Sequence, residues 1–288
     1  MIGIGLLFML GPLVVVPLGI RLIDGGVGRV ALALRRLAIA LAVPAAVALA
    51  VAMTLAPGPA AGVATLPWLV VGLVHAVSAA VDLAPVDVEP RRPSAWIDLV
   101  AAAFLVVGVA WILADRLDLR PGGFDPTTVR LTAVHFHFAG FGLLTIAGRL
   151  IDGGGLVPRV AAASVAIGVP LVATGFLGFP VAGLAGVVGV ASGGVLVGLV
   201  QLAAAGAMRS RMAQWLARVG GFSLLVTMPM AVLWQLGQVL PMTAIDMTAM
   251  VRVHGVLNAL GFAVASMVAW TLDRSGAVAR SPIAVAAL

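Results

Sequence analysis

Long apolar runs recur along the whole of this chain and constrain its fold more than any other feature. A run of about 18 residues with few charges is long enough to cross a lipid bilayer as a helix. Of the 288 residues, 62% are hydrophobic and 10% are charged, against about 25% charged in a soluble domain. We therefore predict an all-α, polytopic membrane helix bundle that forms a single transmembrane domain, residues 1–288. The nine expected helices lie near residues 2–20, 37–56, 63–82, 96–114, 129–148, 158–178, 181–207, 216–239 and 247–271.

The arginines predict how these helices are oriented. All 17 basic residues are arginine, and basic residues accumulate in the cytoplasmic loops of membrane proteins. With the N-terminus outside, 13 of the 17 arginines fall on the cytoplasmic side, so we predict an N-out, C-in topology. These are Arg21, Arg29, Arg35, Arg36, Arg91, Arg92, Arg149, Arg159, Arg209, Arg211, Arg218, Arg274 and Arg280. The outer side keeps Arg116, Arg120, Arg130 and Arg252.

The boundary at 178–181 is the weakest of the predicted helix ends. It depends on Gly175, Gly178 and Pro180, because glycine and proline are the residues that most often interrupt a helix. Without this boundary the bundle would have eight helices, and the arginines would no longer gather on the cytoplasmic side of the membrane.

Several kinds of chemistry are excluded by residues that the chain lacks. Without cysteine it has no disulfides, thiolate metal ligands or cysteine nucleophiles. It also lacks the H-E-x-x-H, D-x-x-x-D, G-x-S-x-G and Walker motifs. The net charge of +6 comes from arginines at helix ends, so we expect membrane lipids and no nucleic acid as partners. The composition is typical of a bacterium with a GC-rich genome, which predicts a multi-pass protein of the bacterial inner membrane.

The chain contains an apparent internal repeat. RLIDGG occurs at 21–26 and at 149–154, and GLVH at 72–75 corresponds to GLVQ at 198–201. The halves would be residues 21–148 and 149–274, preceded by one helix that we expect to be retained rather than cleaved as a signal peptide. Four helices in each half preserve orientation, which is typical of parallel repeats. The repeat pairs His135 with His254, and His75 with Gln201.

Polar side chains from several segments fall at one predicted depth in the outer half of the bilayer. His135 lies about 10 Å along its helix, and His254 lies at a similar depth. Asn258 is one turn below His254 on the same face, and Asp246 begins that helix. Gln235 and Gln238 lie near the outer end of the preceding helix, beside Trp234. Polar groups within a bilayer normally face the bundle interior and mark a site, so we expect these residues to converge.

The motif HFHFAGF at 135–141 places two histidines two positions apart. Such residues point about 200° apart on a helix, so His135 and His137 cannot both face one pocket. We favour His135 for a cavity, because the repeat pairs it with His254, and assign His137 to a hydrogen bond between helices. His75 shares a helix face with Ser78 and Asp82, which indicates either a second polar track or a bond between helices.

The chain resembles the YndJ-like family of bacterial integral membrane proteins at HFHFAGF, at VHGVLNALGFA (253–263) and in the early PLVVVPLGIRLI. This resemblance implies a multi-pass membrane protein with histidines in its spans. No activity is established for that family, so the resemblance implies no catalytic role for any residue.

The function that these residues favour is acid–base chemistry, cyclisation or isomerisation, on a lipid-soluble prenyl or terpenoid substrate. Such an enzyme needs an acid, a base and an apolar cavity whose rings stabilise a cation. We expect no cofactor for it. The candidate catalytic residues are His135, His254, Asp246, Asn258, Gln235 and Asp98. The candidate substrate-binding residues are Phe138, Phe141, Trp111, Trp234, Gln238, His137, His75 and Phe262.

Three other interpretations remain open. His135 and His254 could ligate a haem or a metal ion from two sides, which would make the protein a redox protein. Parallel repeats are also found in carriers of small or lipidic molecules. Finally, membrane-embedded His, Asn and Gln often only join helices, each contributing about 0.6–2 kcal/mol.

Overall fold

The computed structural model describes residues 2–23, 28–84, 92–240 and 245–274. Arg91 and Arg280, which the topology prediction uses, lie outside these residues. The described residues form helices joined by short connections, and eight helices are long and apolar enough to cross a membrane. A shorter apolar helix precedes them. The predicted all-α membrane bundle is therefore confirmed.

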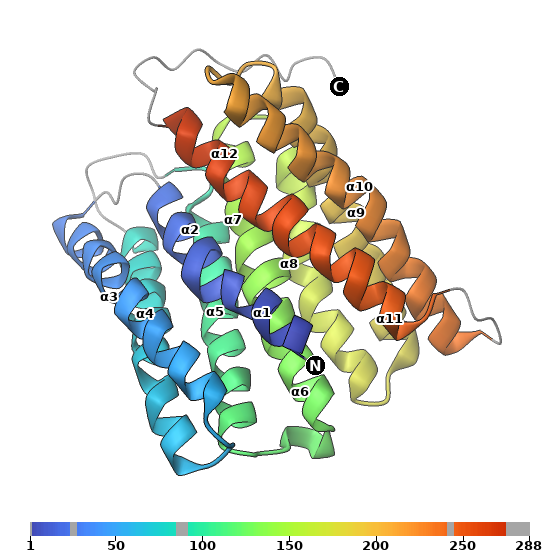
Figure 1. The fold of residues 1–288 in the computed structure, drawn as a ribbon. Helices are drawn as coiled ribbons and strands as arrows, with labels where there is room; N and C mark the ends of the chain where they lie inside the picture. Colours follow the sequence, from blue (N-terminus) through green and yellow to red (C-terminus); the bar gives the residue numbers. More distant parts are fainter. Residues whose placement is uncertain (1, 24–27, 85–91, 241–244, 275–288) are drawn as a thin grey trace. The chain divides into compact units, whose positions relative to one another are not determined.

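The chain divides into two compact units, Met1–Thr145 and Ile146–Leu288, which we call unit 1 and unit 2 and describe separately. Unit 1 begins with an irregular helix made of α1 (Ile2–Leu10), η1 (Gly11–Val15) and α2 (Val16–Leu22). The membrane-length helices α3 (Arg29–Thr54), α4 (Pro59–Leu83) and α5 (Ala95–Arg116) follow. A short turn η2 (Pro121–Gly123) leads to α6 (Pro126–His135) and the π-helical η3 (Phe136–Leu143). Within this unit α4 packs between α3 and α5, and α5 packs against α6 and η3 (Figure 1).

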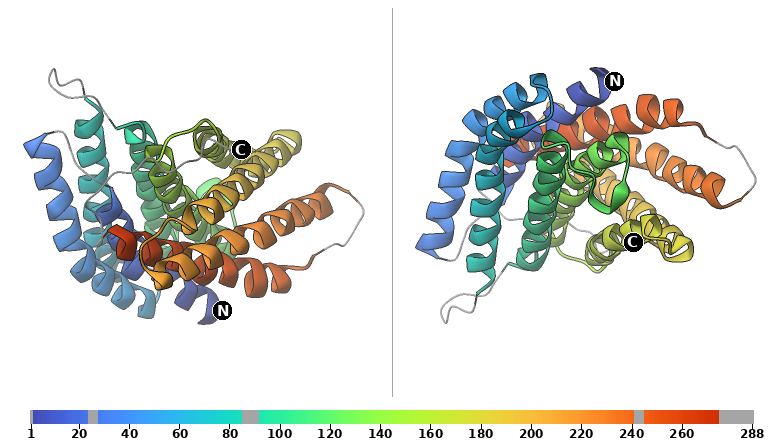
Figure 2. Two further views of the ribbon diagram at one scale, coloured as in Figure 1. Left: turned by 90° about the horizontal axis from the view of Figure 1, so that it is seen from above. Right: turned by 90° about the horizontal axis from the view of Figure 1, so that it is seen from below.

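Helix α7 (Leu144–Asp152) contains the boundary between the units. In unit 2, α8 (Val157–Phe176) pairs with α9 (Pro180–Ala205), and α9 pairs with α10 (Arg211–Val239) (Figure 2). The last span consists of α11 (Met247–Ala249), η4 (Met250–Gly255), η5 (Leu257–Val264) and α12 (Ala265–Arg274), and it packs on α10. The predicted break at 178–181 is confirmed, because α8 ends at Phe176 and Gly178 turns the chain with φ +94°.

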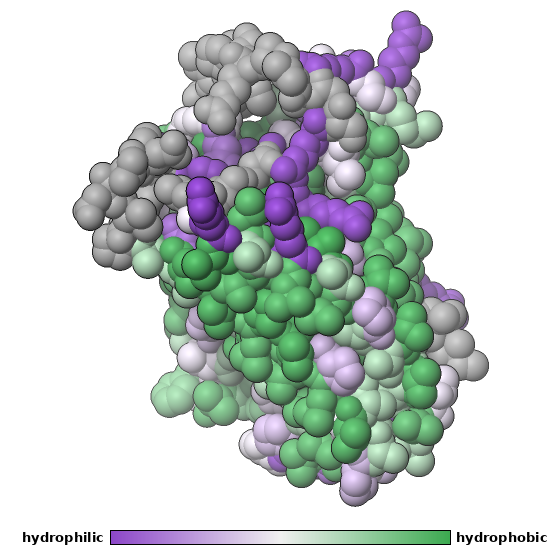
Figure 3. All heavy atoms as spheres, turned by 90° about the vertical axis from the view of Figure 1, so that its left-hand side faces the viewer, coloured by the Kyte–Doolittle hydropathy of each residue, from purple (hydrophilic) through white to green (hydrophobic). Residues whose placement is uncertain are grey.

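The surface has the character expected of helices in lipid. On α3, Val43, Val47 and Val51 are each more than half exposed, and on α4 Val63 and Val77 are too. Figure 3 shows hydrophobic side chains over the middle of the face that it draws, with the most hydrophilic side chains towards one end. Exposed valines of this kind are stable against acyl chains, because a lipid tail is as apolar as the side chains themselves.

Glycines bring α8 and α9 into backbone contact. A Cβ atom built on Gly186 would lie 2.4 Å from the backbone nitrogen of Val172, and one on Gly175 would lie 2.9 Å from Cα of Gly183. Small residues at a helix–helix contact are the usual means of association inside a membrane. This hairpin therefore depends on the absence of side chains at these positions.

Candidate functional site

The predicted site residues fall in both units. Unit 1 contains His75, Asp98, Trp111, His135, His137, Phe138 and Phe141. Unit 2 contains Trp234, Gln235, Gln238, Asp246, His254, Asn258 and Phe262. The predicted convergence involves residues of both units.

His137 is fully buried in unit 1, and both of its ring nitrogens are occupied. Nδ1 lies 2.8 Å from the carbonyl oxygen of Ala133, and the indole N–H of Trp68 donates to Nε2 across 3.1 Å. A carbonyl can only accept and an indole N–H can only donate, so His137 is neutral with its proton on Nδ1. Its ring stacks on that of Trp68, and Phe8 meets it edge-on at 5.1 Å. Sequence reasoning missed Trp68 and Phe8, because no local pattern connects three distant segments.

A glycine on α5 completes the enclosure of His137. A Cβ atom on Gly108 would lie 2.9 Å from Nδ1 of His137 and 2.9 Å from Cβ of Phe136. The side chain of His137 therefore occupies the space that any larger residue at 108 would need.

His135 and His137 lie on opposite sides of their helix, as predicted, and the hydrogen bond between helices that we assigned to His137 is confirmed by its contact with Trp68 of α4. His135 is exposed, and its Nδ1–H donates to the carbonyl of Leu131 at 2.7 Å on its own helix. His137 takes the interior position instead. Gly108 of α5 and Gly140 of η3 permit this interior position, because without side chains there α5 can approach η3 closely.

His75 on α4 is the one histidine whose ring nitrogens are both buried and lack any hydrogen-bond partner in the described part of the chain. It is 1% exposed, and its ring meets Phe141 edge-on with centroids 5.8 Å apart. Ser78, one turn further along α4, donates its hydroxyl to the carbonyl of Ala31. His75 therefore does not form the bond between helices that we considered for it.

Buried ion pairs form one end of the polar face of α4. Asp82 lies 3.2 Å from Arg35 and 3.5 Å from Arg92, and Arg92 also binds Asp98 at 2.6 Å. We call these four residues the Asp82 cluster. Asp98, a predicted catalytic acid, is thus held by an arginine in a buried network.

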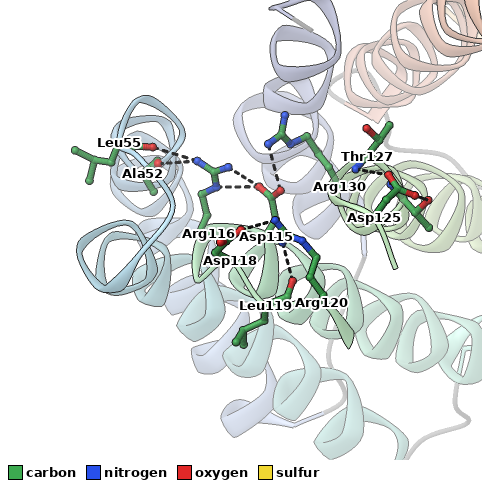
Figure 4. A network of polar contacts seen from close by, with 11 residues as sticks. Ala52, Leu55, Asp115, Arg116, Asp118, Leu119, Arg120, Asp125, Thr127 and Arg130 are labelled. Atoms are coloured by element: carbon green, nitrogen blue, oxygen red, sulfur yellow. Dashed lines mark hydrogen bonds and ion pairs between the residues drawn. The ribbon is translucent and has the colours of Figure 1, made fainter. Parts of the chain in front are cut away.

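A second network lies at the opposite end of α4, near its first residues (Figure 4). Arg116 and Arg130 both bind the carboxylate of Asp115, at 2.7 and 3.2 Å. Arg116 also reaches the carbonyls of Ala52 and Leu55 at the end of α3, each at 3.4 Å. We call Asp115, Arg116 and Arg130 the Asp115 cluster. It ties the ends of three helices together, and the charge pattern alone did not indicate it.

In unit 2, His254 and Asn258 both bind one residue of α10. Nδ1 of His254 donates to the carbonyl of Thr227 at 2.9 Å, and the Thr227 hydroxyl donates to Oδ1 of Asn258 at 2.9 Å. The predicted common face of His254 and Asn258 is therefore confirmed. Thr227, which joins them, was not predicted.

Gln201, the repeat partner of His75, is fully satisfied by hydrogen bonds. Its Nε2 donates to the hydroxyl of Ser266 at 2.8 Å and to the carbonyl of Ala217 at 2.9 Å. Its Oε1 accepts from the indole N–H of Trp270 at 3.4 Å. Gln201 therefore differs from His75, because its side-chain nitrogen and oxygen both have hydrogen-bond partners.

The remaining predicted residues have varied surroundings. Asp246 is exposed and caps α11, accepting a hydrogen bond from the backbone N–H of Ala249 at 2.6 Å. Trp111 lies 6.1 Å from the ring of Phe124. Phe138, Phe141 and Phe262 are buried, Trp234 and Gln235 are half-buried, and Gln238 is exposed. Among the described residues, no group of three or more His, Asp or Glu side chains could hold a metal ion.

Membrane-length apolar helices, lipid-compatible surfaces and buried polar networks together define a multi-pass helical membrane protein. The model of the YndJ-like protein family matches residues 6–262, so the chain belongs to that family. No curated protein and no solved structure matches it.

Proposed function

We propose that this protein is an enzyme of the bacterial inner membrane that performs acid–base chemistry on a lipid-soluble prenyl or terpenoid substrate. We assign its proton-transfer centre to His75 in unit 1. The observation that carries the proposal is that both ring nitrogens of His75 are buried without a partner in the described residues.

A buried polar group without a partner destabilises a protein by about 1–3 kcal/mol. The bilayer core offers no bulk water to compensate for this loss. A histidine kept in such a position suits a partner that the described residues do not supply, and we assign that part to a polar group of a bound molecule. A neutral imidazole has one donor and one acceptor nitrogen, so it can hold a substrate and exchange a proton with it.

The carboxylates favour isomerisation over cyclisation. Cyclisation that begins by protonating an alkene needs a neutral carboxylic acid. The carboxyl groups of Asp82, Asp98 and Asp115 are each held by an arginine, and that of Asp246 is an exposed helix cap, so none of these four is offered to a substrate as a free acid. Isomerisation needs only a base where the substrate has a carbonyl group beside the carbon that loses its proton: His75 would take that proton, the electron pair would pass to the carbonyl oxygen, and the proton would return to another carbon as the double bond shifts. No oxidant or reductant is required.

Deuterium exchange tests this proposal directly. Membranes that contain the protein are incubated in deuterated water, and their lipid extract is analysed by mass spectrometry. We expect one lipid species to gain deuterium with the wild-type protein and not with His75→Leu. His75→Gln should still bind that lipid, because it retains hydrogen-bonding groups, but should not label it.

The stability of His75→Leu provides the matched control. Replacing an unpartnered buried imidazole by an apolar side chain should leave thermal stability unchanged or raise it. Loss of labelling in a variant of full stability would therefore reflect chemistry. Equal labelling of every lipid with wild type and His75→Leu would overturn the proposal.

A haem-binding redox protein is the second candidate, favoured by the geometry of His135. A ligating histidine usually donates its other ring N–H to a carbonyl or carboxylate, as Nδ1 of His135 does to Leu131. A Soret band or stoichiometric iron in the purified protein, lost in His135→Ala, would favour this function over the isomerase. A colourless, metal-free protein would remove it.

A further inference from the structure

A groove on the surface of unit 2 combines an apolar floor with a positive charge at one end. It runs along α10 between Trp215 and Val226 and is closed on one side by Leu257 of η5. Trp215 and Phe222, both more than half exposed, form its rim. Its volume is about 310 Å³.

Arg218 lies at the end of this groove and has no carboxylate partner among the residues that the structure describes. Its guanidinium lies over the indole ring of Trp215, 5.7 Å from the ring centroid. This contact orients the side chain but does not neutralise its charge. Arg209 and Arg211 precede it at the same end of α10, and the first turn of that helix contains no acidic residue.

The dimensions of the groove match one lipid leaflet. From Arg218 to Val226 the helix rises about 12 Å, and the hydrocarbon of one leaflet is about 15 Å thick. The predicted topology puts the Arg218 end on the cytoplasmic side, where basic pockets bind anionic headgroups. An acyl chain on the apolar floor would therefore bring a phosphate to the level of the guanidinium.

We infer that this groove is a binding site for an anionic phospholipid, with the phosphate on Arg218 and an acyl chain along Phe222 and Val226. The guanidinium can donate two parallel hydrogen bonds to a phosphate. A zwitterionic lipid also has a phosphate, but its headgroup carries a positive charge that competes with the guanidinium for it. This inference does not depend on the proposed enzymatic function.

Brominated lipids give a direct test, because bromine on an acyl chain quenches a nearby indole. The protein is reconstituted in vesicles of phosphatidylcholine and phosphatidylglycerol, with bromine on one lipid or the other. The contribution of Trp215 is obtained by subtracting the signal of Trp215→Phe. We expect brominated phosphatidylglycerol to quench it more strongly than brominated phosphatidylcholine at equal mole fraction, and Arg218→Gln to abolish the difference.

Arg211→Gln is the matched control, since it removes an equal charge at the same end of α10 but outside the groove. The preference should survive this change. Equal quenching by both lipids in the wild type would overturn the proposal. So would an equal loss of preference in Arg211→Gln and Arg218→Gln, because it would indicate attraction to the surface charge in general. Arg218→Lys, which keeps the charge on a more compact group, should retain part of the preference.

Discussion

The indole N–H of Trp68 donates to Nε2 of His137 across 3.1 Å, and the two rings stack with planes 14° apart. Together with the bond from Nδ1 to Ala133, this contact fixes the tautomer of His137 and leaves no ring nitrogen for a ligand. His75 lies two turns after Trp68 on the same face of α4, and neither of its ring nitrogens has a hydrogen-bond partner in the part of the chain that the structure describes. The two buried histidines of unit 1 therefore differ in whether their ring nitrogens have partners among the described residues.

Trp68→Phe should destabilise the protein, because it removes the donor and leaves Nε2 of His137 buried without a partner. The expected loss is about 1–3 kcal/mol. It can be measured as a lower Tm in detergent. Trp96→Phe is the control, since Trp96 is 37% exposed. An equal effect of the two substitutions would contradict the role assigned to the Trp68–His137 bond.

Asp82→Asn should be more damaging, because it leaves Arg35 buried at 3.2 Å from an uncharged group. Removing one partner of a buried ion pair typically destabilises a protein by about 3–5 kcal/mol. The control is Asp118→Asn, which breaks an exposed ion pair with Arg120 and should cost about 0–1 kcal/mol. Asparagine also suits the positive φ of 59° at residue 118. Equal melting temperatures for the two variants would show that the Asp82 cluster does not hold α3 and α4 together.

The helices could be predicted from the sequence because each depends on a local property, the length of its run of apolar residues. The break between α8 and α9 was predictable for the same reason, since Gly178 and Pro180 act locally. The opposite directions of His135 and His137 also followed from the geometry of one helix. These predictions needed no knowledge of how one segment packs on another.

The partners of the buried side chains could not be predicted, because they come from distant segments. Trp68 and His137 are 69 residues apart, and Arg35 and Asp82 are 47 apart. The preference for His135 rested on an offset of the repeat that pairs it with His254. The π-helical segments Phe136–Leu143 and Leu257–Val264 have equal lengths of 8 residues, and aligning them pairs His137 with Asn258 instead. A π-helical segment adds a residue to a helical turn, and the pattern of apolar residues gives no clear signal of it.

Asp125 should give the beginning of α6 a measurable dependence on pH. It lies just outside the membrane span, and the hydroxyl of Thr128, followed by the backbone N–H of Thr128, lowers the pKa of its carboxyl below the ordinary 3.8. A lowered pKa in the folded state means that the stabilisation is present above the ordinary value and is lost as the pH falls through the lowered value. Thr128→Val removes the main cause, so its Tm should be lower than that of the wild type at neutral pH.

The difference in Tm between wild type and Thr128→Val should shrink as the pH is taken below 3.8, because the carboxyl becomes protonated in both. Thr127→Val is the control, since Thr127 contributes only its backbone N–H to Asp125. A constant difference across the whole range would mean that the Thr128 hydroxyl acts through packing and not through the charge of Asp125.

Two glycines of α9 should respond to alanine in opposite directions. A Cβ atom on Gly186 would lie 2.4 Å from the backbone nitrogen of Val172, so Gly186→Ala must push α8 and α9 apart. Overpacking of this kind typically destabilises by about 1–3 kcal/mol. At Gly189 the nearest atom would be 3.5 Å away, an ordinary contact, so Gly189→Ala should gain helix propensity of up to about 1 kcal/mol. The check is the Tm of each variant in the same detergent: Gly186→Ala should fall below the wild type and Gly189→Ala should equal or exceed it. A fall of the same size in both variants would mean that the two helices are held by something other than direct backbone contact at Gly186.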